Sequence, residues 1–586
     1  MLGILTANII KKEDVFMNTL VIVLIAVVVL GLGYVLYGRR IAKKWGIDPK
    51  AETPAVKYND GKDYVPTNGW TVFSHQFSSI AGAGPVTGAI QAAVFGWLPV
   101  LLWILIGGVF FGAVTDFGAL YASVKNQGKS MGMLIEKYIG KLGRKLFLLF
   151  CWLFSLLIIA VFADMVSGTF TAFDAVSGAK LPAASTNGSA GMVSIMFMLF
   201  AVVFGLIQKK FNFSGWKEFV LGVVFIVVSF AIGMKVPIIL GKDGWSYVVF
   251  AYIFIAAIMP IWLMKQPRDY MTTIMFVCMI VGAALGLIIG HPTMNLPVFT
   301  GFKNEQLGTM FPILFVTVAC GAVSGFHSLV SSGTSSKTIA NEKDMLKVGY
   351  GAMILESVLA VLALCVAGAA AKNGIPAEGT PFQIFSSGVA GFFEKMGLSV
   401  HFSTVFMTMC VSALALTTLD AVARIGRMSF QELFSVDDMK NAKPWRKLLC
   451  NTYFSTIFTL ACGFVLTKIG YQTIWPLFGS ANQLLSALVL ITLCVFLKVT
   501  GRSNKMLFPP MIIMLCVTFT ALIQRVVGLV KSLVAGQEIF ASVIQLVVAV
   551  LLITLALIIA VNSFKSYVRS KKGSEVEEAE KTPVNE

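Results

Sequence analysis

The sequence predicts an all-α polytopic membrane protein with about 15 transmembrane helices. Of the 586 residues, 57% are hydrophobic and only 13% are charged, whereas a soluble domain carries roughly 25% charged residues. The mean hydropathy is +0.82, and apolar runs of about 20 residues, each long enough to cross a bilayer, recur along the chain. This composition excludes a soluble enzyme, a disordered protein and a disulfide-rich secreted scaffold.

The expected spans cover residues 18–37, 70–96, 97–124, 146–170, 191–208, 218–237, 245–264, 270–290, 309–332, 348–371, 402–422, 448–467, 474–497, 507–530 and 539–564. They divide the chain into four regions. Residues 1–59 hold a leader, the first span and a basic loop, and residues 60–428 form the core. Residues 429–564 form a second transmembrane region, and residues 565–586 a charged tail. A basic amphipathic stretch, residues 131–144, is expected to lie on the inner membrane surface.

The formal net charge of +17 would suggest a nucleic-acid partner in a soluble protein, but cytoplasmic loops of membrane proteins are rich in lysine and arginine. If the N-terminus is outside and the chain alternates through the expected spans, most of the 46 Lys and Arg residues fall on the cytoplasmic side. The sequence therefore predicts an N-out, C-in protein of a cytoplasmic membrane, with lipid and not nucleic acid around it.

Two expected spans are interrupted by small residues at mid-depth. The first contains Ala81, Gly82, Ala83 and Gly84, followed by Pro85. The second contains Gly321, Ser324 and Gly325. Such residues free backbone N–H and C=O groups, which hydrocarbon tolerates only where they line a protein cavity or bind a ligand. Paired interrupted spans therefore point to a substrate site at the midplane, and close helix packing through small residues is the alternative.

Ionisable residues inside the expected spans are few and costly. His75, Asp116, Asp164 and His327 are candidates for proton coupling, because histidine titrates near neutral pH and the two histidines flank the two breaks. Hydrogen-bonded core histidines and structural aspartates are the competing interpretation. Glu356 is a further acidic residue within a span. Asp420 lies four residues before Arg424 on a helix, a spacing that suits a structural ion pair.

Other polar residues in the spans leave alternatives open. Asn482 and Gln483 suit either substrate contact or hydrogen bonding between helices. Ser331, Ser332 and Thr334 offer hydroxyl oxygens that suit sodium. With four histidines, nine cysteines and no CxxC pair, we expect no metal site and no cofactor. The lack of a GxxxxGK[ST] motif disfavours ATP-driven transport.

A series of motifs between residues 60 and 497 resembles the carbon starvation protein A (CstA) family of bacterial inner-membrane transporters. The matching stretches are residues 60–67 (DGKDYVPT), 81–85, 112–117 (GAVTDF), 163–170 (ADMVSGTF), 267–270 (PRDY), 319–337, 417–420 (TTLD) with Arg424, and 475–484. Gln76 departs from the pattern, since many members have a second histidine there.

The resemblance implies a carrier of the amino acid–polyamine–organocation superfamily with a LeuT-like inverted-repeat core. It also implies uptake of scarce nutrients under carbon limitation: peptides for some members, and pyruvate with protons for others. We therefore expect a proton-coupled importer and not an enzyme. A sodium-coupled symporter of amino-acid-like substrates is the alternative. A channel would need a continuous polar pore, and a membrane-embedded enzyme would need a catalytic constellation that the sequence does not display.

Overall fold

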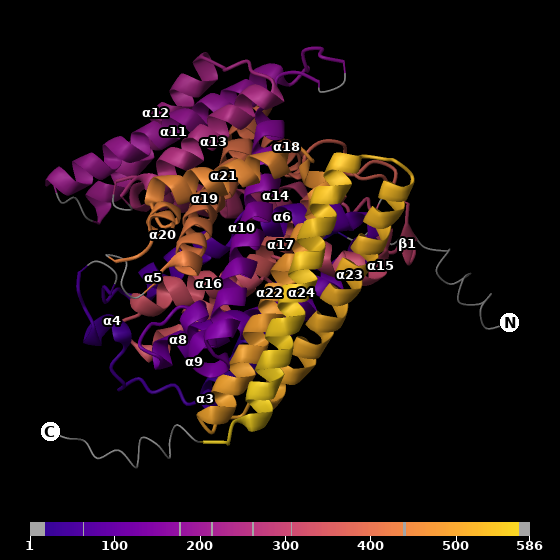
Figure 1. The fold of residues 1–586 in the computed structure, drawn as a ribbon. Helices are drawn as coiled ribbons and strands as arrows, with labels where there is room; N and C mark the ends of the chain where they lie inside the picture. Colours follow the sequence, from indigo (N-terminus) through magenta and orange to yellow (C-terminus); the bar gives the residue numbers. More distant parts are fainter. Residues whose placement is uncertain are drawn as a thin grey trace.

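The computed structural model describes residues 18–61, 64–174, 177–211, 215–260, 263–305, 307–436 and 441–573. The expected leader, residues 1–16, and the end of the expected tail beyond residue 573 lie outside them. The described chain is largely helical (Figure 1). It also holds one short antiparallel pair, β1 (Lys303–Asn304) and β2 (Gly308–Thr309), in which Lys303 pairs with Thr309.

The helices of the first half are α2 (Thr19–Leu32), η1 (Gly33–Gly38), α3 (Arg39–Trp45), α4 (Pro54–Lys57), α5 (Gly69–Ile80), α6 (Gly84–Ala92), η2 (Ala93–Phe95), α7 (Trp97–Gly107), η3 (Gly108–Gly112), α8 (Ala113–Lys125), α9 (Met131–Ile139), α10 (Lys141–Phe170), α11 (Ala184–Phe211), α12 (Trp216–Lys235), α13 (Lys242–Ile258) and α14 (Lys265–Gly290). Those of the second half are α15 (Met310–Thr317), α16 (Gly325–Gly333), η4 (Ser335–Lys337), η5 (Glu342–Asp344), η6 (Leu346–Gly351), α17 (Ala352–Ala370), α18 (Pro381–Lys395), α19 (Val400–Phe434), α20 (Pro444–Leu449), α21 (Thr452–Thr467), α22 (Tyr471–Val499), η7 (Lys505–Leu507), α23 (Phe508–Val534) and α24 (Ile539–Arg569).

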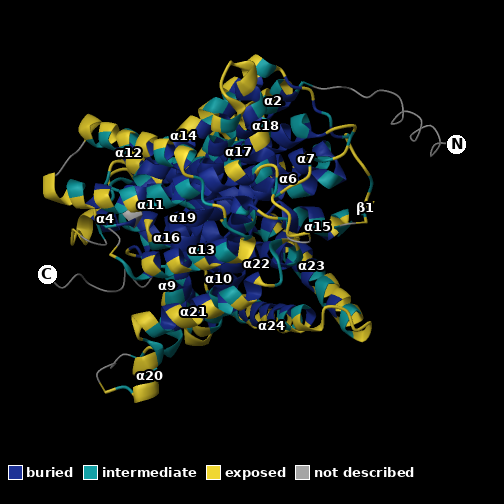
Figure 2. Cartoon of the chain, turned by 90° about the horizontal axis from the view of Figure 1, so that it is seen from above, coloured by how far each residue is buried: buried dark blue, intermediate teal, exposed yellow. Residues whose placement is uncertain are grey.

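Eleven helical stretches of the described residues are long and apolar enough to cross a membrane, so the chain is a multi-pass membrane protein. The apolar stretch of α22 is wholly buried within protein and that of α19 is 89% buried, whereas that of α2 is 22% buried. Figure 2 shows the same gradient, with buried residues in the centre and exposed residues on outer helices such as α12 and α24. The outer helices present apolar side chains to lipid, and α10, α19 and α22 form the centre.

The remaining four of the fifteen expected spans are not single long helices. Two are broken, into α5 and α6 and into α15 and α16. The other two contain α13, with 17 residues, and α21, with 16 residues. The expected tail begins later than predicted, because α24 continues to Arg569.

Two short helices join long ones at opposite ends of the bundle. α9 connects α8 to α10, and α18 connects α17 to α19; in Figure 1, α9 lies toward the bottom and α18 toward the top. α18 has no counterpart among the expected spans, because its 15 residues are too few to cross a membrane. It begins with a capping box, in which the Gln383 backbone N–H donates to the Thr380 hydroxyl and the Thr380 backbone N–H donates to the Gln383 side-chain oxygen. Each connector precedes a long central helix, α9 before α10 and α18 before α19. These two long helices pack along one another.

Candidate functional site

The first break lies between α5 and α6, at residues 81–83. Ala81 has φ −71° and ψ 60°, and the Gly82 N–H donates to the Ile80 carbonyl at 2.7 Å, so the helix ends in an inverse γ-turn. α6 then begins at Gly84 with Pro85 in its first turn, where the missing proline N–H leaves no intrahelical bond unmade. The Ala/Gly/Pro run therefore stops one helix and starts another within three residues.

The second break, residues 318–324, separates α15 from α16. Side chains of neighbouring helices bond the carbonyl groups that the break frees. The Trp475 indole donates to the Thr317 carbonyl at 3.3 Å, and the Trp103 indole donates to the Val318 carbonyl at 3.3 Å. A buried backbone group without a partner would cost about 1–3 kcal/mol, so these indoles help to hold the break open.

The two breaks touch. A Cβ atom built on Gly84 would lie against the Cys320 Sγ, and one built on Gly321 would lie 3.7 Å from the Pro85 Cα. The Gly321 carbonyl in turn accepts a hydrogen bond from the Ser357 hydroxyl at 3.0 Å. The small residues chosen from sequence are thus brought together at one place, with α6 and α16 both starting there.

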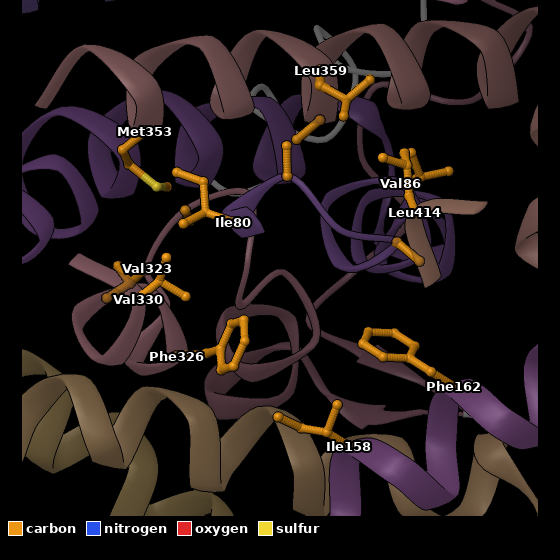
Figure 3. Packing of buried hydrophobic residues seen from close by; sticks show 14 of the residues in the cluster. Ile80, Val86, Ile158, Phe162, Val323, Phe326, Val330, Met353, Leu359 and Leu414 are labelled. Carbon is orange, nitrogen blue, oxygen red and sulfur yellow. The ribbon is translucent and has the colours of Figure 1, made fainter. Parts of the chain in front are cut away.

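A cavity of about 20 Å³ lies between the breaks. It is lined by Ile80, Gly82, Gly84, Ile158, Phe162, Cys320, Phe326, His327, Thr418, Phe478 and Asn482. Figure 3 shows Ile158 and Phe162 on α10 and Phe326 on α16 forming apolar walls around this space. Such a cavity has room for one water molecule, so this conformation closes the centre of the protein to anything larger.

Asn482 and Gln483 connect α22 to the second break. The Asn482 Oδ1 accepts from the Ser324 hydroxyl and from the Phe326 N–H, both at 3.1 Å. The Gln483 Nε2 donates to the Phe315 carbonyl, in α15, at 2.6 Å. Both side chains hydrogen-bond between helices, and Asn482 also lines the cavity.

Gly325 is required by the contact between α16 and α22. A Cβ at this position would lie 2.5 Å from the Asn482 carbonyl oxygen and 2.5 Å from the Ser486 nitrogen, both backbone atoms that cannot rotate away. We expect Gly325→Ala to destabilise the protein by about 1–3 kcal/mol through overpacking. A lower thermal unfolding midpoint of the detergent-purified protein would measure it.

Gly333, at the other end of α16, is the matched control. A Cβ there would meet no atom within 4 Å, and alanine is the better helix former. Gly333→Ala should therefore leave the midpoint unchanged or slightly higher. Equal midpoints for the two variants would contradict the close approach of α16 to α22.

Asp116, His327 and Glu356 form a buried cluster beside the cavity. The His327 Nδ1 lies 3.0 Å from the Asp116 Oδ2, and its Nε2 lies 3.3 Å from the Glu356 Oε2. The side chains are 0–1% exposed, and among the described residues no lysine or arginine pairs with either carboxylate. Each residue comes from a different element, α8, α16 and α17, so the sequence could not show that they meet.

A proton on each side of the imidazole would satisfy both of its carboxylate contacts. A neutral imidazole has one N–H donor and one bare nitrogen. If Nδ1–H donates to Asp116, the contact between Nε2 and Glu356 needs a proton on one of those two atoms. Both Glu356 oxygens and the His327 Nε2 lack a hydrogen bond of good geometry to any described residue. The cluster therefore places one imidazole between two buried carboxylates that no lysine or arginine of the described residues neutralises.

His75 and Asp164 lie outside this cluster. The His75 side chain is exposed on α5, and its neighbour Gln76 is buried. Asp164 pairs with the Lys242 Nζ at 2.8 Å and accepts from the Tyr471 N–H at 2.9 Å. These contacts tie α10 to the starts of α13 and α22, as a structural aspartate would.

The hydroxyl groups considered for sodium have protein partners or face outward. Ser331 accepts from the Gln76 Nε2 at 2.8 Å. The Ser332 hydroxyl donates to the Ser328 carbonyl at 2.7 Å and accepts from the Met131 N–H at 3.1 Å. Thr334 is exposed. Among the described residues, no group of three or more His, Cys, Asp or Glu side chains is placed to hold a metal ion.

Asp420 and Arg424 belong to a larger buried network. Their Oδ1 and Nε atoms lie 3.2 Å apart. Arg268, which the sequence analysis did not single out, contacts the Asp420 Oδ2 at 3.2 Å and the Asp269 Oδ1 at 3.1 Å. Its guanidinium also donates to the Tyr252 hydroxyl. The network joins α13, α14 and α19.

Comparisons with known proteins agree with the motif pattern. A family model described as "Carbon starvation protein CstA" matches residues 18–375 and 369–521. The "Pyruvate/proton symporter BtsT" of Escherichia coli is 31% identical over 86% of this chain and 81% of its own length. The "Peptide transporter CstA" of Helicobacter pylori (strain ATCC 700392 / 26695) is 31% identical, over 90% and 84%, and that of Bacillus subtilis is 28% identical, over 95% and 98%.

A solved manganese transporter of Eremococcus coleocola aligns over 88% of this chain and 99% of its own, at 11% identity and a TM-score of 0.45. That score is too low to assign a fold. The family match spans most of the described chain, and the three relatives match it over 81–98% of their own length. The chain belongs to the carbon starvation protein CstA family.

Proposed function

We propose that this protein is a secondary active transporter that imports short peptides or small organic anions such as pyruvate together with protons. The single observation that carries the proposal is the position of His327. Its ring lies between Asp116 and Glu356, and it also lines the cavity between the two helix breaks. A group that holds a proton and borders the central cavity can link protonation to substrate occupancy. The relatives named for peptide and for pyruvate/proton transport support the same function.

The helix breaks supply the chemistry for an anionic substrate. The N-termini of α6 and α16 carry partial positive charge and backbone N–H groups that suit a carboxylate, which pyruvate and a peptide C-terminus both possess. Ala81, Gly82, Ala83 and Gly84 on one side and Gly321, Ser324 and Gly325 on the other would shape this site, with Asn482 beside it. Because the present cavity holds only one water, substrate entry requires α6 or α15 to move away from the centre.

Proton and substrate would stabilise one another at this site. Substrate carboxylate next to an unprotonated cluster would place several negative charges in a low-dielectric interior. A proton on the cluster removes one of them, so the conformational change with both proton and substrate bound costs less than the same change with substrate alone. After release of both, the empty protein with a deprotonated cluster would change back to the outward-facing conformation.

The order of elements supports a LeuT-like inverted repeat. A broken helix, a long helix, a short connector and a long central helix follow one another twice: α5/α6, α7/α8, α9 and α10, then α15/α16, α17, α18 and α19. The connectors α9 and α18 lie toward opposite ends in Figure 1, as repeats of opposite orientation require. We include fifteen spans in this proposal: the eleven long helical stretches, the two broken spans, α13 and α21.

We place the protein in the bacterial inner membrane with its N-terminus outside and its C-terminus inside, on the distribution of lysine and arginine. Thiol labelling of intact cells tests this orientation. An S185C label should react from outside and a K571C label only after permeabilisation. We also infer that import serves cells short of carbon, which the protein level in carbon-replete and carbon-depleted cultures tests.

Uptake into proteoliposomes tests the function itself. With an inward proton gradient, labelled pyruvate or labelled dialanine should accumulate above its external concentration, and a protonophore should abolish the accumulation. Accumulation that survives the protonophore but requires sodium would replace proton coupling by the sodium alternative and direct attention to Ser331, Ser332 and Thr334. Downhill flux without accumulation under either gradient would contradict secondary active transport.

A further inference from the structure

We propose that Arg525 forms an outer binding site that captures the carboxylate of the substrate before it reaches the helix breaks. The inference rests on the proposed transport function and adds a residue and a second site to it. It is carried by a cavity, by the position of one partly buried cation and by the separation between that cavity and the central one.

The cavity is the larger of the two spaces that border both broken spans. It measures about 840 Å³ and is bordered by α6, β2, α15, residues 376–384, α22 and α23. Ligand pockets typically measure about 300–1,000 Å³, so this outer vestibule can hold a dipeptide, whereas the central cavity of about 20 Å³ cannot. The loops that border it are those predicted to lie on the extracytoplasmic side of the membrane.

A still larger cavity, of about 1260 Å³, lies on the flank of α7 and α15. Leu102 and Ile106 on its border are exposed apolar side chains of a membrane-spanning stretch. This flank suits hydrocarbon, and it does not reach the helix breaks.

Arg525 is the one charged side chain among the described residues that line the outer vestibule. It lies on α23, and its Nη2 donates to the Thr473 carbonyl at 2.9 Å and to the Gln545 side chain. Its Nε is buried without a hydrogen-bond partner, and no carboxylate of the described residues forms an ion pair with it. An arginine in a span is costly when it has no counter-ion. Glu538 attracts this guanidinium through space without forming an ion pair with it, so the cation remains able to bind a second carboxylate.

The chemistry of Arg525 selects a carboxylate. A guanidinium binds carboxylate oxygens through charge-assisted and often bidentate hydrogen bonds. A cleft with one sign of charge and low-dielectric walls also raises the local concentration of the opposite charge. The neutral lining residues Gln91, Gln472 and Gln524 would leave this attraction uncompensated.

The vestibule opens directly above the centre. Gln91 lines the vestibule and Gly84 lines the central cavity. They are two turns apart on α6, or roughly 10 Å. On α22, Ser480 borders the vestibule and Asn482 borders the central cavity. Along α6, the two cavities are therefore separated by about two helical turns.

A thiol probe measures the field in the vestibule without any transport. The Q472C substitution places a thiol next to the Thr473 carbonyl that Arg525 binds. The measured quantity is the reaction rate of the anionic sulfonatoethyl methanethiosulfonate divided by that of the cationic trimethylammonioethyl reagent. We expect this ratio to be higher in Q472C than in Q472C/R525Q. One charge at this range should change the ratio of the two rates about tenfold. Q472C/Q545M, which removes the acceptor but keeps the charge, should leave the ratio unchanged. Equal ratios in Q472C and Q472C/R525Q would overturn the proposal, whether or not the protein transports either substrate.

Uptake kinetics then test capture of the carboxylate. For pyruvate and for dialanine, whichever the wild type accumulates, R525Q should raise KM about tenfold with little change in kcat. Dialanine amide, which has no carboxylate, should show the same KM in both proteins if it is carried. A fall in kcat with unchanged KM, or the same loss in Q545M, would assign Arg525 to the α22–α24 contact instead. Wild-type protein that carries neither substrate would defeat the transport function while the thiol result still stands.

Discussion

Replacing His327 by glutamine is expected to abolish uphill accumulation of substrate while exchange of internal for external substrate continues. Glutamine is similar in length and retains hydrogen bonding to Asp116, but it cannot bind a proton at neutral pH. With one proton per substrate and no membrane potential, a gradient of one pH unit supplies about 1.4 kcal/mol, or roughly tenfold accumulation. The variant should therefore fall from about tenfold to no accumulation under that gradient.

Glu356, a second member of the cluster, is expected to give the same result. Glu356→Gln keeps the shape of the side chain and removes the proton shared with the His327 Nε2, so it should uncouple transport in the same way. His401→Gln is the matched control, because His401 contacts Thr186, far along the chain from the breaks. Proteins at normal membrane levels that accumulate substrate with either cluster variant would contradict a coupling role. Loss of the folded protein in both would assign the cluster to structure.

Removing Arg268 is expected to produce the largest loss of stability. Its side chain is 2% exposed and lies between Asp420 and Asp269. Truncating one partner of a buried ion pair strands the remaining charge, at a cost of about 3–5 kcal/mol. Arg268→Met should therefore lower the thermal unfolding midpoint of the purified protein strongly or prevent its purification.

Two further variants make this result interpretable. Lys468→Met breaks an ion pair with Asp243 whose side chains are 45% and 79% exposed, and such surface pairs contribute about 0–1 kcal/mol. Its midpoint should match the wild type. Asp420 keeps its ion pair with Arg424, so Asp269 is the charge that the Arg268→Met substitution strands. Arg268→Met combined with Asp269→Asn removes that charge and should recover part of the loss. No recovery would mean that Arg268 acts through packing and its bond to Tyr252.

The sequence predicted the helix breaks well and the polar contacts less well, for a physical reason. Gly82, Pro85 and Gly321 act on their own backbone, so local sequence is enough to indicate where a helix stops. The meeting of Asp116 with Glu356 across His327 depends on how three separate helices pack, which no local pattern encodes. His75 was chosen and Gln76 was not. Apolar residues occur on more than one side of α5, so its sequence alone does not show which side is buried.

Helix length explains why the spans were harder to count than to locate. α18 has a capping box and an amphipathic pattern but too few apolar residues to register as a span. α13 and α21 are short, and the broken spans are split into pieces of 8–12 residues. Hydropathy reports total apolar length, whereas the structure depends on where each helix begins and ends.

The two indoles that donate hydrogen bonds to the second break also make its conformation measurable by tryptophan fluorescence. Trp103 and Trp475 donate to the carbonyls of Val318 and Thr317, the residues at which α15 gives way to the break. Movement of α15 must lengthen or break these bonds, and indole emission depends on the polarity and hydrogen bonding around the ring. The protein therefore carries intrinsic fluorophores at its own hinge, and the difference between wild-type and W475F spectra reports opening in real time without an attached dye.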